Sequence, residues 1–198
     1  MKSVKKIIGI IGDFGFVSKN EKIFEDLDLL ILNVKNEDDL EKCDGLFFGT
    51  SSFFQLQKFF GDVFFQKVLL KIENNFPVLC FGQSCEFFLS KIGDGNFEKK
   101  GKIDDFEGEI FLDFLDSKPM KIKVFKNFYY GEKKIFGAKK YLYFIKKFFD
   151  KNTKIEKFGE IENGKNTIFI YKKTLFTIFS PEFYGDKRIY EYFISNFI

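Results

Sequence analysis

The chain has 198 residues, 45% of them hydrophobic and 31% charged, a balance that fits one soluble globular domain with a full core. The net charge of +3 is small and is mixed along the chain, whereas a nucleic-acid-binding protein would carry a concentrated basic face. The absence of histidine excludes histidine acid–base catalysis and removes the commonest zinc ligand. Three cysteines without framework spacing indicate reduced thiols, and we expect a cytoplasmic protein.

The first half of the chain alternates predicted strands with predicted helices. Short apolar runs at 6–11, 29–34, 45–48 and 77–81 indicate buried strands. Helices are expected at 36–43, at 53–74 with an interruption at Gly61-Asp62, and at 86–92. Because strands that alternate with helices form parallel sheets covered on both faces, this half predicts a mostly parallel central sheet.

The second half predicts mainly strands and hairpins, closed by one helix at 187–197. The expected strands are 109–114, 121–129, 141–145, 154–161, 167–171 and 175–179, with turns at 162–165 and 172–173. No repeat or low-complexity linker divides the chain, so we expect one domain over residues 1–198. No apolar run is long enough to span a membrane, and we expect no signal peptide and no membrane contact.

Phenylalanine is unusually abundant, with 32 residues. We interpret most of these side chains as core residues. Two clusters, Phe59-Phe60 and Phe64-Phe65, are alternatively candidates for a surface that a partner covers.

Four segments, taken in order, match motifs of one known family. They are VKNEDDLEKCDGLFFG (34–49), DDFEGEI (104–110), YFIKKF (143–148) and SPEFYGDKRIYEYF (180–193). Together they resemble the glutaminase subunit of pyridoxal phosphate synthase, a class I glutamine amidotransferase. The match extends over nearly the whole chain, except for about 119–140, which we interpret as an insert.

This resemblance implies a three-layer flavodoxin-like class I glutamine amidotransferase fold, with helices on both faces of the sheet and extra antiparallel strands in the C-terminal half. It also implies a reaction in which an elbow cysteine attacks the glutamine amide, a histidine oriented by a glutamate activates the thiol, and a Gly-Gly turn binds the oxyanion. This chemistry needs no cofactor and no metal ion, and we expect neither. The implied partner is the lyase component of the synthase, a (β/α)8 barrel that receives the ammonia.

The position of the family histidine is held by Ser180. A serine hydroxyl cannot act as a base near neutral pH, because its deprotonated form is not accessible there. Glu182 stands at the orienting position but has no imidazole to orient. We favour the alternative that Glu182 caps the last helix or pairs with Lys187 or Arg188.

The position of the nucleophile depends on the anchor used for counting. Counting forward from Pro77 places it at Gly82, whereas two other anchors place it at Gln83 and Ser84. No anchor selects Cys85, although this residue lies next in the chain and remains a candidate nucleophile. We favour the alternative that Cys85 is a small buried residue.

The substrate-binding positions also depart from the family pattern. Only Gly49 remains of the glycine pair in the oxyanion turn, and Thr50 and Ser51 follow it. Losing a glycine restricts positive φ, so the backbone donors need not face a substrate. Lys146 replaces the family arginine and cannot make its bidentate contact.

Three interpretations of function follow. The leading one is a catalytically inactive amidotransferase-like protein that binds a partner subunit. The second is a working glutaminase that supplies ammonia for pyridoxal 5'-phosphate biosynthesis, with Cys85 as nucleophile and Glu182 or Glu86 as base. The third is a binding module on another assembly, in which the insert, rich in Lys, Phe and Tyr, contacts an anionic partner such as RNA.

Overall fold

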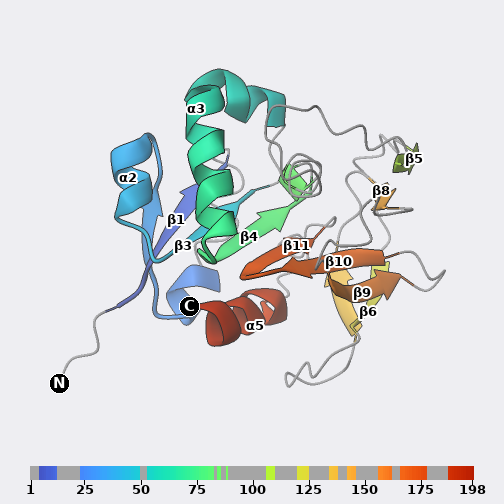
Figure 1. Cartoon of the computed structure of the whole chain (residues 1–198). Helices are drawn as coiled ribbons and strands as arrows, with labels where there is room; N and C mark the ends of the chain where they lie inside the picture. Colours follow the sequence, from blue (N-terminus) through green and yellow to red (C-terminus); the bar gives the residue numbers. More distant parts are fainter. Residues whose placement is uncertain are drawn as a thin grey trace.

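The structure is a computed structural model of the whole chain (Figure 1). It describes residues 5–12, 23–49, 53–82, 84–85, 88, 106–109, 120–124, 134–137, 142–145, 156–161, 166–177 and 187–198. For 53–55, for the strands between 106 and 161, and for 166–167, it describes the backbone alone.

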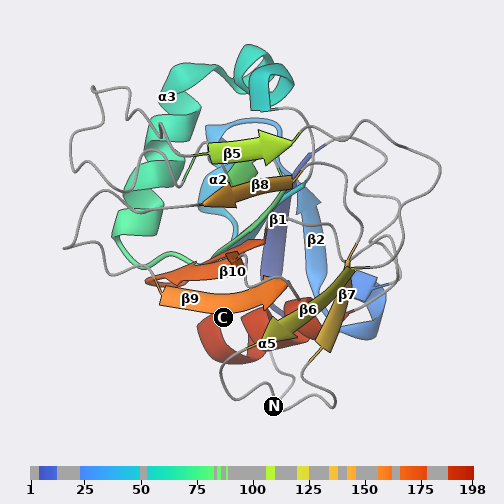
Figure 2. The same ribbon diagram turned by 90° about the vertical axis from the view of Figure 1, so that its right-hand side faces the viewer.

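The described strands form one large sheet and one small one. The large sheet contains a parallel group: β1 (Ile7–Ile11), β2 (Leu30–Asn33), β3 (Gly45–Phe48), β4 (Val78–Phe81) and β11 (Thr174–Thr177). An antiparallel group continues it: β10 (Asn166–Tyr171), β9 (Glu156–Ile161), β6 (Met120–Val124) and β7 (Lys134–Gly137). The strand order is β2-β1-β3-β4-β11-β10-β9-β6-β7. The small sheet pairs β5 (Phe106–Glu109) with β8 (Leu142–Ile145) and is visible in Figure 2.

Helices cover both faces of the parallel strands, as Figure 1 shows. On one side lie α2 (Glu37–Glu41) and α3 (Phe53–Glu73), and on the other lies α5 (Arg188–Phe197). The predicted three-layer fold, with a parallel sheet extended by antiparallel strands in the C-terminal half, is confirmed. No helix of the described residues is long and apolar enough to cross a membrane.

The core has two halves because neighbouring residues of a strand face opposite sides of the sheet. Phe48 packs on the α3 side, where its ring centroid lies 4.9 Å from that of Phe88. Phe47 packs on the α5 side, 5.6 Å from the ring of Tyr190 and 5.6 Å from that of Phe193. The continuous apolar run of β3 therefore supplies both cores at once, as expected for a strand buried on both faces.

The predicted interruption of the long helix at Gly61 is confirmed. Gly61 has φ 76° and ψ 168°, which breaks α3 into two helical segments. Only glycine adopts this conformation without a steric penalty from Cβ. The break changes the direction of the helix and leaves the segment before it, which carries Phe59 and Phe60, beside the end of β2.

Other expectations need correction or remain outside the described residues. The run 29–34 is predicted to be buried, but β2 is an edge strand and exposes Leu30 and Ile31. The sequence does not predict β7. β5 begins at Phe106, three residues before the predicted start, and residues 110–114 lie outside the described residues, as does most of the predicted helix 86–92.

Gly9 in β1 offers a test of the packing on the α3 side. A Cβ added to Gly9 would lie 2.5 Å from the Cys43 sulfur and 2.7 Å from side-chain atoms of both Leu46 and Val34. We expect Gly9→Ala to lower the free energy of unfolding by about 1–3 kcal/mol, because overpacking a dense core costs this much. Urea denaturation measures the change, and Lys58→Ala on the exposed side of α3 serves as the control. An unchanged midpoint for Gly9→Ala would contradict this packing.

Candidate functional site

The candidate site lies at the carboxyl ends of the parallel strands, where open α/β sheets bind their ligands. Gly49 follows β3 and Gly82 follows β4. These two ends are neighbours because β3 and β4 are paired, with Phe48 opposite Cys80. The fold therefore brings together the ends of the two strands after which the sequence predicts the nucleophile and the oxyanion turn.

The chain turns sharply from strand to helix at Gly82. This residue has φ 57°, in the left-handed region, and its N–H donates to the Thr177 carbonyl at 2.9 Å. The chain is helical at Ser84 and Cys85, and the Cys85 N–H already donates to the Gly82 carbonyl at 3.1 Å. A tight strand–turn–helix corner of this kind is the geometry that presents a nucleophile in elbow-type hydrolases. Of the three positions that counting allows, Gly82 has the left-handed φ, Ser84 is already helical, and Gln83 lies outside the described residues.

Cys85 lies inside the core, with 1% of its surface exposed. Its single thiol proton is shared between the carbonyl oxygens of Cys80 and Thr177, each of which lies 3.1 Å from the sulfur. Burial raises the pKa of the Cys85 thiol far above its ordinary value, which favours the neutral form. A buried, neutral thiol that donates to two carbonyls is a poor nucleophile.

The other two cysteines are also free and buried. Burial is the main cause that raises the pKa of Cys43 to about 11, and burial raises the pKa of Cys80 well above its usual value. All three thiols of the chain are therefore placed as core residues rather than as reactive groups.

The N–H and the carbonyl of Gly49 both form hydrogen bonds within the fold. Its N–H donates to the Ile11 carbonyl at 2.8 Å and so continues the ladder between β1 and β3. Its carbonyl accepts a hydrogen bond from the buried Ser84 hydroxyl at 2.9 Å. The Gly49 N–H is thus occupied within the fold, and Ser84 ties the end of β3 to the helix after the corner. The sequence indicates Ser84 only as a nucleophile position, since nothing in the local pattern signals this long-range bond.

Several predicted site residues lie outside the described residues. These are Ser180, Glu182, Lys146, Thr50, Ser51, the nucleophile position Gln83 and the alternative base Glu86. The chain is described again from Lys187, which forms ion pairs with Asp26 at 3.5 Å and with Glu191 at 3.8 Å. Across the described ranges, no three His, Cys, Asp or Glu side chains are grouped as a metal site requires.

Comparisons with known proteins locate this arrangement among solved structures. No protein-family model matches the sequence, and no curated protein matches it. Among solved structures, a glutamine amidotransferase superposes with a TM-score of 0.67 at 15% identity, covering 95% of this chain and 97% of that chain. A protein from Thermoplasma acidophilum that is named as one of the subunits of GMP synthase gives a TM-score of 0.62 at 14% identity, covering 97% and 94% of the two chains.

A third structure, PurLQS from Thermotoga maritima, gives a TM-score of 0.63 at 8% identity, covering 96% of this chain and 98% of that chain. In each case the superposition covers almost all of both chains. At these identities the likeness concerns the fold, and we conclude that this chain has a glutamine amidotransferase-like fold.

Proposed function

We propose that this chain is an amidotransferase-like protein that does not hydrolyse glutamine and that acts by binding a partner subunit. The observation that carries the proposal is Gly82, which stands at the strand-to-helix corner with φ 57°. Glycine has no side chain, so the corner presents no nucleophile. The fold brings this corner next to Gly49, where an amide substrate would otherwise be bound and attacked.

The nearest thiol supports the proposal. Cys85 follows the corner by three residues, and its sulfur lies under the sheet between two main-chain carbonyls. To attack a substrate at the edge, this sulfur would have to break both hydrogen bonds and leave the core. The chain also has no histidine to remove the thiol proton.

The oxyanion side gives further support. Stabilising a tetrahedral intermediate requires N–H donors that are free and aimed at the developing charge. The Gly49 N–H already donates a hydrogen bond to the Ile11 carbonyl. The corner residue therefore has no side chain, the chain has no histidine base and this donor is occupied, while the backbone around them keeps the amidotransferase-like fold.

Binding is the role that this fold can still perform. One of the structural neighbours is named as a subunit of GMP synthase. For this chain, the four segments that resemble the glutaminase subunit of pyridoxal phosphate synthase favour the barrel-shaped lyase subunit of that enzyme as the partner. The lyase subunit would then contact the outer surface of the fold, and this contact would not need a reaction at Gly82.

Ammonia release from glutamine tests the loss of catalysis. We expect no release above the uncatalysed background, with or without the lyase subunit, because no thiolate is presented at the corner. The assay compares the natural chain with Cys85→Ala and with Cys43→Ala, a control that also removes a buried free thiol. Release that disappears only in Cys85→Ala would overturn the proposal in favour of a working glutaminase.

Thiol alkylation tests the burial that the proposal depends on. At pH 8 a thiol whose pKa is about 11, as for Cys43, is ionised in about one molecule in a thousand. We expect iodoacetamide to leave all three cysteines of the folded protein unlabelled and to label all three in urea, as read by peptide mass spectrometry. Rapid, stoichiometric labelling of Cys85 in the folded protein would contradict its placement in the core.

Native mass spectrometry tests the proposed partner. We expect the chain to form a complex with the lyase subunit of pyridoxal phosphate synthase whether or not glutamine is present, because binding needs no catalytic residue. Cys85→Ala should bind equally well. The absence of any complex across a titration of the lyase subunit would refute this choice of partner, while leaving the catalytic part of the proposal to the ammonia assay.

A further inference from the structure

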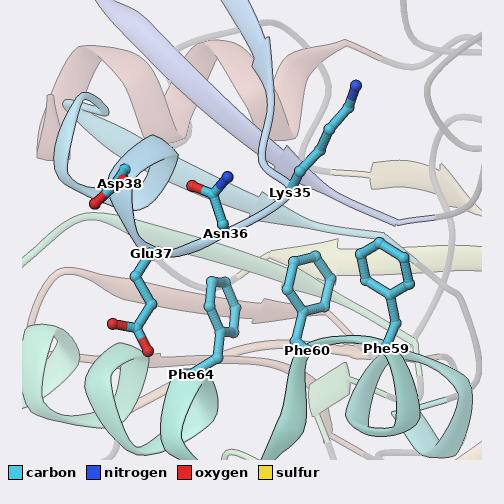
Figure 3. A pocket seen from close by; sticks show the side chains of 7 residues that line it. All are labelled: Lys35, Asn36, Glu37, Asp38, Phe59, Phe60 and Phe64. Atoms are coloured by element: carbon cyan, nitrogen blue, oxygen red, sulfur yellow. The ribbon is translucent and has the colours of Figure 1, made fainter.

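A groove of about 360 Å³ lies on the surface between the segment after β2 and the part of α3 on both sides of Gly61. Figure 3 shows its two walls. The polar wall is the segment 35–38, and the aromatic wall consists of Phe59, Phe60 and Phe64. This groove involves none of the groups at the Gly82 corner.

The aromatic wall leads from the core to the solvent. Phe64 is buried, and Phe60 stacks on it with the ring centroids 4.4 Å apart. Phe59 meets Phe60 edge to face at 4.8 Å, yet 70% of Phe59 is exposed. A phenylalanine that stands out this far leaves most of an aromatic ring in water, although it is held against a row of packed rings.

The polar wall is fixed in place by the cap of α2. The Asn36 side chain accepts a hydrogen bond from the Asp39 N–H at 3.0 Å, and the Asp39 carboxylate accepts one from the Lys35 N–H at 3.1 Å. Glu37 is paired with Lys67 of α3. These contacts order the wall, so the groove is a formed feature of the surface.

The two ends of the groove carry opposite charges. In Figure 3, Asp38 lies at the end of the row marked by Phe64, and Lys35 lies at the end marked by Phe59. Both side chains are exposed, and within the described part of the chain neither of them has an ion-pair partner. The exposed Phe59 ring therefore lies at the Lys35 end of the groove, and Asp38 lies at the other end.

We propose that this groove is the contact between two copies of the chain related by a two-fold axis. When this axis lies in the contact plane and perpendicular to the groove, it sets the two grooves against each other in opposite directions. It brings Lys35 of each copy toward Asp38 of the other, and it brings each Phe59 over the Phe64 end of the facing groove. A contact in which both copies use the same surface requires that this surface be complementary to itself. Here the protruding Phe59, the groove and the charges of Lys35 and Asp38 all lie on one face.

The surface fits a second copy better than a small ligand. An anion or a cation would match one end of the groove and leave the other charge unpaired. A two-fold contact neutralises both ends and covers both exposed rings in a single step. Aromatic anchors that fill a facing pocket, ringed by charge pairs, are the usual energetic centre of a protein–protein contact. This inference does not depend on the proposed function.

Sedimentation velocity over a dilution series of the full chain tests the contact. We expect a monomer–dimer equilibrium, and we expect Phe59→Ser to raise the dissociation constant at least about thirty-fold, the effect of truncating a central aromatic anchor. Leu70→Ser is the matched control, because Leu70 is also an exposed apolar residue of α3 but lies outside the groove. It should change the dissociation constant by less than about twofold.

A charge exchange tests the antiparallel arrangement. Lys35→Glu and Asp38→Lys should each raise the dissociation constant at least about fivefold, since each creates two like-charged contacts. The double variant should return it to within about twofold of the natural value. Thermal unfolding of each variant shows that the fold is intact. A chain that is monomeric at every concentration, a dimer unaffected by Phe59→Ser, or a double variant as weak as the singles would overturn the proposal.

Discussion

The hydrogen bond from the Gly82 N–H to the Thr177 carbonyl fixes the end of the central strand, and the corner depends on it. β4 is buried between β3 and β11, so the chain cannot continue straight without leaving its hydrogen-bond partners. It turns instead through a left-handed φ at Gly82 and enters a helix within two residues. The backbone bonds of the sheet, rather than any catalytic side chain, define the corner.

The same constraint means that the corner does not depend on a catalytic side chain. A left-handed φ is costly for a residue with a Cβ and nearly free for glycine, so Gly82 relieves strain that a cysteine would store there. The helix then carries Cys85 back under the sheet, and the Ser84 hydroxyl closes the gap to Gly49. These contacts stabilise the fold and occupy the Ser84 hydroxyl and the Cys85 thiol.

The elements that the sequence predicts are those whose signals are local. The apolar runs of β1, β3 and β4 and the interruption at Gly61 are confirmed, because strand burial on both faces and positive φ leave marks in the residue types. The edge position of β2, with Leu30 and Ile31 exposed, depends on strand order and leaves no local mark. Counting along the sequence likewise leaves Gly82, Gln83 and Ser84 open, because it cannot detect a hydrogen bond such as the one from Gly82 to a strand more than ninety residues away.

Reaction with a glutamine-like electrophile tests most directly whether the corner has lost its nucleophile. Such a reagent binds where the substrate amide would bind and forms a covalent adduct only with a thiol presented there. We expect the intact mass of the folded chain to stay unchanged after prolonged incubation. A single stoichiometric adduct mapped to Cys85 would contradict this expectation, because the structure places this sulfur inside the core.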